Sequence, residues 1–292
     1  MSTLYTFCPH EGSGIACGYL LDWVVKQMPW GDKWVIDQQK RTVIPQLVES
    51  AGTAAYFQSL NKLIEETLLN AKETKSFKVL EGWRNELYPV TGLSSEISME
   101  RSGSALFGIN SYGVHMTAYV KTEKGMKIWV PRRQQHKSTY GGMLDNTVAG
   151  GISFGESVLN SLIRESEEEA SFSEQLIRQH AKFCGTVSYF MVRDENAGGE
   201  TGLLQPECQF VYDLELSPDI IPKPNDDEVE SFQLWPVEKV QKAMAEAQFK
   251  PNCALVLLDF FVRHSILTPE NEKDYVDIVS RLHRRLPFST RG

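Results

Sequence analysis

Hydrophobic side chains recur at helical spacing in the first quarter of the chain. Between residues 56 and 70 they fall every three or four positions, at Phe57, Leu60, Leu63, Ile64 and Leu68. This period matches the turn of an α-helix that buries one face, so residues 56–70 are predicted to form an amphipathic helix. The rest of residues 20–75 is interpreted as helical patterns joined by short connectors.

The pattern changes near residue 108. Residues 82–90, GWRNELYPV, favour a turn that leads into an extended segment, and residues 106–113 are punctuated by glycine. We therefore divide the chain into a small N-terminal α+β module, residues 1–108, and a second module, residues 109–292. A role for the first module in shaping a substrate pocket is our hypothesis.

The second module mixes strand and helix patterns. Residues 114–133 hold two β-rich runs on either side of turn residues 123–125, which predicts a β-hairpin. Further strands are predicted at residues 185–192 and 208–216, and helices at residues 237–247 and 252–264. Pro251 suits the first turn of the last helix. The second module is therefore mixed α/β.

Residues 150–171, GGISFGESVLNSLIRESEEEAS, form the most informative stretch. Ser153 and Glu156 have the spacing of a capping box, which predicts that a helix starts just after Gly151. At about 100° per residue, the apolar side chains share one arc that must face the core. These side chains are Val158, Leu159, Leu162, Ile163 and Ala170.

Three carboxylates gather beside that arc. Glu165, Glu168 and Glu169 fall within about 100° of one another, whereas Glu167 points away. Like charges about 4 Å apart repel by about 1 kcal/mol even in water, so the cluster calls for a counter-ion. Arg164 is expected to pair with Glu168 one turn on. Hard carboxylate ligands suit Mg²⁺ or Mn²⁺, while the competing interpretation is a solvated acidic surface helix.

Composition narrows the function. A formal charge of -8 and a pI near 5.4 argue against general binding of nucleic acid or anionic membranes. The apolar runs are too short to span a bilayer, and no secretory signal is apparent. The five cysteines lack metal-ligand spacing, which favours free thiols. A cytoplasmic protein is expected, and its oligomeric state is left open.

The acidic helix resembles a known motif. Gly150, Glu156, Arg164, Glu165, Glu168 and Glu169 match six of the seven fixed positions in the Nudix box, G-x5-E-x7-R-E-U-x-E-E-x-G-U, where U is a bulky aliphatic residue. Ser166 and Ser171 depart from it, at the aliphatic position and at the second glycine. We expect Ser166 to hydrogen-bond locally, for instance to the carbonyl four residues back.

The resemblance implies a fold and a set of roles. The fold would be a mixed β-sheet sandwiched between helices, with the box as loop, helix and loop. Glu165, Glu168 and Glu169 would be catalytic and metal-binding acids for Mg²⁺, for which Mn²⁺ can substitute, with the Gly150 carbonyl as a further ligand. Arg164 would orient these acids. Either Glu165 or Glu169 would be the general base.

The likeness extends beyond the box. EGWRNELYPV, GGMLDNTVAGG, DDEVESFQLWPVEKV and FKPNCALVLLDFFVRH resemble the Nudix subfamily related to the Nudix part of fungal thiamine pyrophosphokinases. That resemblance implies hydrolysis of oxo or oxy forms of thiamine diphosphate to the monophosphate, a metabolite-repair reaction. Alternatives are another nucleotide or isoprenoid diphosphate as substrate, or a non-catalytic Nudix-fold protein that binds a ligand.

Residues outside the box are weaker candidates. Arg132, Arg133 and Lys137 are basic and precede the box, so they are candidates for binding substrate phosphates, against the alternative of a solvated basic loop. Glu228, in an acidic run, is a candidate for an additional metal ligand. The default role is turn formation for Asp145 and Asn146 and core packing for the aromatic residues. The histidines show no metal spacing.

Overall fold

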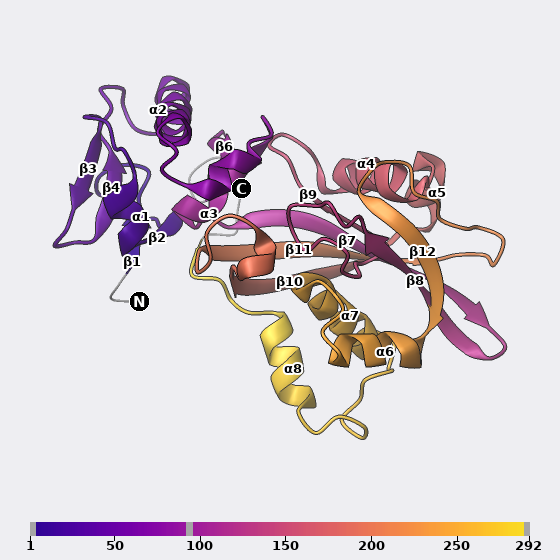
Figure 1. The fold of residues 1–292 in the computed structure, drawn as a ribbon. Coiled ribbons are helices and arrows are strands. Elements are labelled where there is room, and N and C mark those ends of the chain that lie inside the picture. Colours follow the sequence, from indigo (N-terminus) through magenta and orange to yellow (C-terminus); the bar gives the residue numbers. More distant parts are fainter. Residues whose placement is uncertain (1–3, 92–95, 289–292) are drawn as a thin grey trace.

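The computed structural model describes residues 4–91 and 96–288 of the protein. Figure 1 shows two parts side by side, a small N-terminal module and a larger module built on a long twisted sheet. The N-terminal module contains β1 (Leu4–Phe7), β2 (Gly18–Leu21), α1 (Asp22–Gln27), β3 (Trp34–Asp37), β4 (Thr42–Pro45), α2 (Ala54–Glu73), β5 (Leu87–Pro89), β6 (Ser98–Glu100) and α3 (Ser104–Phe107).

The N-terminal sheet corrects one prediction. Residues 20–75 do not alternate only between helices and connectors, because β2, β3 and β4 form a sheet with β1 in the order β2-β1-β4-β3. The runs in β3 and β4 are short and rich in β-branched residues such as Val35, Ile36 and Val43, which pack well on a pleated surface. A four-residue strand is too short for its period to be distinguished from that of a helix.

Helix α2 confirms the predicted amphipathic helix. It begins after Thr53, whose side chain accepts a hydrogen bond from the Tyr56 amide. Its buried face includes Leu60, Ile64 and Leu68, which are fully inaccessible to solvent. The helix therefore holds the N-terminal core together, and that core also contains Leu203 from the second module.

The second module is a mixed sheet. Its strands are β7 (Ser111–Thr122), β8 (Gly125–Arg133), β9 (Val148–Gly151), β10 (Lys182–Val192), β11 (Leu204–Glu215) and β12 (Val229–Pro236). The main order is β10-β11-β7-β8-β12, and β9 also pairs with β7. The predicted hairpin is confirmed, because β7 and β8 pair antiparallel around Thr122 and Gly125. Strands β7 and β11 run parallel.

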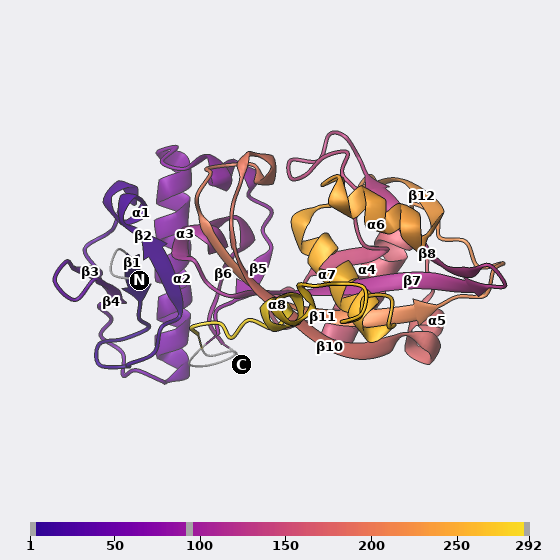
Figure 2. The same ribbon diagram turned by 90° about the horizontal axis from the view of Figure 1, so that it is seen from below.

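Helices cover both faces of this sheet, as predicted. They are α4 (Val158–Ala170), α5 (Glu174–His180), α6 (Val237–Ala245), α7 (Pro251–Arg263) and α8 (Tyr275–Leu282). Figures 1 and 2 show α4 and α5 on one face and α6, α7 and α8 on the other. Alternate residues of β7 serve the two cores, since Val114 and Met116 pack with α4 while Tyr119 packs with α7.

The N-terminal module docks on the loop that precedes α4. The Phe154 amide donates to the Leu87 carbonyl at 2.7 Å, and Ser153 Oγ donates to Glu86 Oε1 at 3.0 Å. A Cβ on Gly151 would lie 2.0 Å from the Tyr88 hydroxyl, so the Tyr88 side chain packs directly on the backbone of Gly151. Strand β5 and its neighbours thus position the loop of the acidic motif.

Two further expectations concern membranes and thiols. Within residues 4–91 and 96–288, no helix is both long and apolar enough to cross a membrane. All five cysteines are free, as predicted.

Candidate functional site

The acidic helix α4 starts later than its sequence pattern predicts. Its N-cap is Ser157, whose side chain accepts a hydrogen bond from the Asn160 amide at 3.2 Å. The prediction that Ser153 and Glu156 form a capping box at the start of the helix is therefore wrong. Gly155 has φ +80°, so the chain turns there before it becomes helical. This turn leaves the Ser153 and Glu156 side chains free to reach Glu86 and Arg164.

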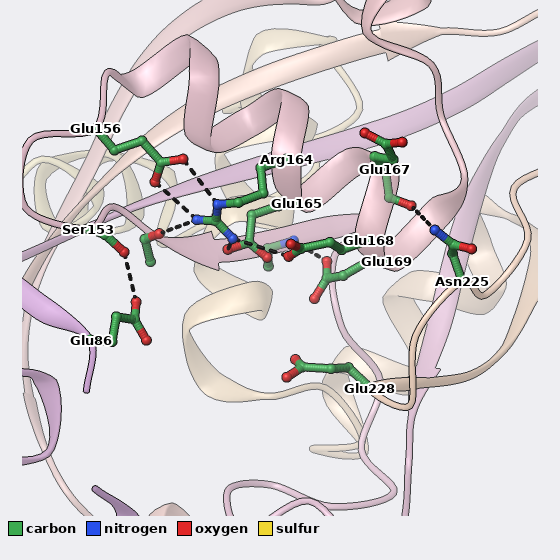
Figure 3. Close-up of polar contacts among 12 residues, drawn as sticks. Glu86, Ser153, Glu156, Arg164, Glu165, Glu167, Glu168, Glu169, Asn225 and Glu228 are labelled. Atoms are coloured by element: carbon green, nitrogen blue, oxygen red, sulfur yellow. Dashed lines mark hydrogen bonds and ion pairs between the residues drawn. The ribbon is translucent and has the colours of Figure 1, made fainter. Parts of the chain in front are cut away.

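Arg164 joins three carboxylates. Its Nε and Nη2 donate to the two oxygens of Glu156 at 3.0 and 3.1 Å. Its Nη1 donates to Glu165 Oε1 at 2.8 Å and to Glu168 Oε2 at 3.2 Å. The predicted pair with Glu168 is thus present, and the same guanidinium also holds Glu156 and Glu165, as Figure 3 shows. The planar fork of arginine suits such multidentate contacts.

The surroundings of Glu165 and Glu169 disfavour the charged form of both carboxyl groups. Burial raises the pKa of Glu165 to about 7, with Arg164 opposing the shift and Glu168 and Glu228 adding to it. Glu169 is 5% exposed, and its Oε2 accepts the Ala149 amide at 2.8 Å. Burial and then the negative charge of Glu165 hold the pKa of Glu169 well above its usual range.

The other helix positions divide as the helical geometry predicts, with one exception. Figure 3 shows Glu167 on the opposite side of α4 from Glu165, Glu168 and Glu169, and its carbonyl accepts from the Asn225 side chain. Ser171 ends the helix with φ 56° and ψ 30°, the left-handed exit for which the motif has glycine. The prediction for Ser166 is wrong, because its buried Oγ has no hydrogen-bond partner.

Two cavities meet beside this helix. The first, of about 450 Å³, lies between the two modules, and its walls include Tyr112, His115, Tyr140 and Glu207. The second, of about 370 Å³, is lined by Glu165, Glu168, Glu228 and Asp226. Glycines 150 and 151 line both cavities. The arrangement places a carboxylate-rich chamber next to a chamber that has room for the organic part of a small molecule.

The carboxylates of Glu165, Glu168 and Glu169 do not converge on a common metal position. Within the residues that the structure describes, no three His, Cys, Asp or Glu side chains are grouped closely enough to hold a metal ion. Arg164 engages Glu165 and Glu168, while Glu169 is turned to Ala149. The donor chemistry nevertheless fits a hard divalent cation, because buried carboxylates of raised pKa lie on one side of α4.

The weaker candidates have varied positions. Arg132 donates to the Gly142 carbonyl and lies outside the residues that line either cavity. Arg133 lines the second cavity but is buried in an ion pair with Asp145, at 2.7 Å. Lys137 and Glu228 also line this cavity and pair with each other. Burial alone would raise the pKa of Glu228, but the Lys137 ammonium keeps it below its usual value.

For several aromatic and histidine residues, the sequence predicts only core packing or no role at all. Trp129 and Trp235 are buried in the core, as expected. Tyr140 is also buried but lines the first cavity. His115 lines that cavity too, and its Nδ1 lies 2.7 Å from Asn146 Oδ1. Burial lowers the pKa of His115, so the ring is neutral at pH 7.

Sequence patterns missed three cations that line both cavities. They are Arg84, Arg101 and Lys250. Positions so far apart carry no shared spacing, so no local signal could have grouped them. Only the docking of the N-terminal module and of α7 brings them to the site.

Comparisons with known proteins give matches along most of the chain. The family model described as NUDIX domain matches residues 112–254, and the one described as Domain of unknown function (DUF4743) matches residues 11–111. The protein YJR142W of Saccharomyces cerevisiae, named as uncharacterized, is 37% identical over 298 residues. That match covers 98% of this chain and 85% of the yeast protein.

Two plant relatives carry the family name. Nudix hydrolase 20, chloroplastic, of Arabidopsis thaliana is 41% identical over 71% of this chain and 54% of its own length. Nudix hydrolase 24, chloroplastic, of the same plant is 37% identical over 70% of this chain and 54% of its own length. The chain thus spans about half the length of these two proteins. From the motif, the fold and these matches, the chain belongs to the Nudix hydrolase family of enzymes that cleave diphosphate linkages, with a DUF4743 module ahead of its Nudix domain.

Proposed function

We propose that this Nudix hydrolase converts the diphosphate of oxidised (oxo or oxy) thiamine to the monophosphate and phosphate, in a reaction that depends on Mg²⁺. The observation that carries the hydrolytic part is the set of carboxylates on Arg164 beside a carboxylate-lined cavity. The thiamine part rests on the resemblance of the sequence beyond the box. The first cavity, next to the acids, supports a substrate with an organic group.

The acids share one task in this proposal, which is to bind the metal ion. Glu165, Glu168 and Glu169 would hold Mg²⁺ or Mn²⁺, with the Gly150 carbonyl and Glu228 as further ligands. The bound cation would neutralise charge on the diphosphate and lower the pKa of a bound water. Arg164 keeps Glu165 and Glu168 in place, because a single nitrogen, Nη1, contacts both.

A carboxylate of this group receives the proton of the attacking water. Glu165 is the first candidate, because its carboxylate lines the acidic cavity and is held there by Arg164. Glu169 is the alternative, because neighbouring acids titrate as a set. The water oxygen forms a new bond to phosphorus, the bridging P–O bond breaks, and the two products are a monophosphate and phosphate.

The first cavity favours a polar ring over an apolar chain. Tyr112, Tyr140 and Met191 offer surfaces for an aromatic group, while Glu207 and Gln209 offer hydrogen-bonding groups. An isoprenoid chain would have to desolvate these polar groups without pairing them, which costs binding free energy. This lining supports a heteroaromatic substrate such as oxidised thiamine diphosphate.

The test is product analysis by mass spectrometry. The protein is incubated with thiamine diphosphate, oxothiamine diphosphate, ADP-ribose and isopentenyl diphosphate, each with and without Mg²⁺. We expect conversion of oxothiamine diphosphate to its monophosphate, dependent on Mg²⁺ and faster than any other reaction. The matched control is Glu168→Gln, an exposed position where the change preserves size and should preserve the fold.

Each outcome has a distinct meaning. Faster reaction of ADP-ribose or isopentenyl diphosphate would overturn the substrate assignment and retain the site. Equal turnover by the Glu168→Gln variant would overturn the site. No reaction with any compound, in protein shown to be folded and to bind Mg²⁺, would favour a ligand-binding protein with a Nudix fold.

A further inference from the structure

The border between the two cavities has a distinctive charge. The residues that line both are Arg84, Arg101, Thr139, Ala149, Gly150, Gly151 and Lys250. Three of them are cations and none is an acid, although the protein as a whole carries a charge of -8. We propose that Arg84, Arg101 and Lys250 form a diphosphate-binding passage, and that the DUF4743 module exists in part to supply two of its three charges.

The three side chains come from separate parts of the chain. Arg84 lies on the turn before β5, and Arg101 directly follows β6, so both belong to the N-terminal module. Lys250 directly precedes α7, where its amide donates to the Leu144 carbonyl at 2.9 Å. Two modules must therefore be docked for the passage to exist.

Other cations of the second cavity are already engaged. Arg133 pairs with Asp145, Lys137 with Glu228, and Arg164 with three glutamates. Arg101 pairs with Glu86 through Nη1, at 2.8 Å, and its guanidinium lies over the Tyr88 ring. Across residues 4–91 and 96–288, Arg84 and Lys250 make no direct salt bridge. Against the effect of burial, the charge of Lys250 still lowers the pKa of Asp145, and that of Arg84 contributes to lowering the pKa of Glu228. These two can therefore contact a ligand without breaking a salt bridge.

Electrostatic attraction favours binding of the phosphates at the border between the two cavities. A diphosphate that entered the acidic cavity alone would meet Glu165, Glu168 and Glu228, all of which repel it. At the border, cations flank it before it reaches those acids. Arginine and lysine form charge-assisted hydrogen bonds to phosphate oxygens, and such bonds are among the strong ones in proteins. The organic group would then occupy the cavity of about 450 Å³.

This inference rests on the proposed function only for the identity of the organic group. The passage itself recognises a diphosphate, whichever compound carries it. Binding of a diphosphate that does not react therefore separates the two proposals. Methylenediphosphonate is suitable, because its P–C–P bridge resists hydrolysis and its affinity is measurable without metal or turnover.

The experiment uses the full chain and three single variants. Arg84→Gln and Lys250→Gln remove the two unpaired charges, while Lys124→Gln removes an exposed charge in the β7–β8 turn as the matched control. Arg101 is left unchanged, since its loss would also leave Glu86 unpaired. Methylenediphosphonate is titrated by calorimetry into each protein in metal-free buffer. We expect about tenfold weaker binding for each passage variant, as for loss of one charged hydrogen bond, and no change for the control.

Two further readouts make the test specific. The affinity of the wild-type protein should fall more steeply with salt than that of either passage variant. Each variant has one positive charge fewer at the passage, so salt screens less of its attraction to the diphosphate. If a diphosphate substrate is found, the passage variants should raise KM more than they lower kcat. Wild-type-like binding by both variants, or no binding of methylenediphosphonate by the wild type, would overturn the passage. Failure of oxothiamine diphosphate to react, with these binding changes intact, would overturn only the substrate.

Discussion

Gly150 leaves the space that the Glu165 carboxyl group occupies. A Cβ at Gly150 would lie 1.9 Å from Glu165 Cδ and 2.0 Å from its Oε1, distances at which atoms overlap. The carboxylate therefore packs directly on the backbone of β9, next to both cavities. The glycine of the Nudix motif is thus explained here by close packing, since Gly150 does not have a positive φ.

The first prediction follows from this contact. Gly150→Ala should displace the Glu165 carboxylate and lower kcat by about a hundredfold, as expected when a catalytic group is misplaced by about 1 Å. Gly31→Ala is the control, because a Cβ there meets no atom within 4 Å. Steady-state kinetics on both variants checks this. Unaltered kcat in Gly150→Ala would show that the position of Glu165 does not matter.

The Glu169→Gln substitution should abolish activity without lowering stability. Glu169→Gln keeps an acceptor for the Ala149 amide and removes a carboxyl group whose charged form is disfavoured by burial and by Glu165. We expect loss of turnover with a Tm of the metal-free protein equal to or above that of the wild type. The increase in Tm on adding Mg²⁺ should shrink. A variant that turns over normally would contradict the role of Glu169.

The raised pKa of Glu165 predicts how stability depends on pH. Its pKa is 4.5 in a flexible chain and about 7 in the folded protein. Between these values the folded state binds more protons than the unfolded state, so raising the pH lowers the stability of the metal-free protein. The slope is at most about 1.4 kcal/mol per pH unit for one proton. Glu169, whose pKa is also raised, acts in the same direction.

This pH effect can be measured by urea unfolding in chelator at pH 5, 6 and 7. Glu165→Gln should flatten the profile, while Glu174→Gln, at an exposed ion pair with Arg178, should not. Mg²⁺ affinity should rise over the same range, because cation and proton compete for the carboxylates. A stability that increases from pH 5 to 7 without metal would contradict the shift.

The left-handed helix exit at Ser171 is strained. Ser171→Gly should be about 1 kcal/mol more stable than Ser171→Ala, because glycine adopts a positive φ without steric cost. The change also loses the hydrogen bond from Ser171 Oγ to the Lys223 carbonyl. Ser171→Ala loses that bond and keeps the strain, so it is the matched control. Thermal unfolding of the two variants separates the contributions, and a glycine variant less stable than the alanine variant would contradict the strain.

Removing the unpaired hydroxyl of Ser166 should make the protein more stable. Its Oγ is buried without a partner, which costs about 1 to 3 kcal/mol relative to a paired group. Ser166→Ala should therefore raise the free energy of unfolding, helped by the higher helix propensity of alanine. Urea unfolding checks this. A destabilised alanine variant would indicate that the hydroxyl finds a partner in solution.

Local patterns determined much of the site in advance. The spacing of Glu165, Glu168 and Glu169 places them on one side of a helix whatever surrounds it, because helical geometry depends only on separation along the chain. Helical spacing also predicted helix α2, and two β-rich runs around turn residues predicted the β7–β8 hairpin; both are confirmed. The start of α4 was misplaced, because the turn at Gly155 competes with the capping signal of Ser153.

Only the tertiary structure decided the rest. Burial of Glu165 and Glu169, and hence their raised pKa, depends on β9 lying against α4. The cationic border unites Arg84, Arg101 and Lys250, which are separated by up to 166 positions of sequence and meet through the docking of two modules. The sequence by itself specified which acids share a helix face, because that is a local property. Which cations face those acids is a long-range property, and packing of the two modules settled it.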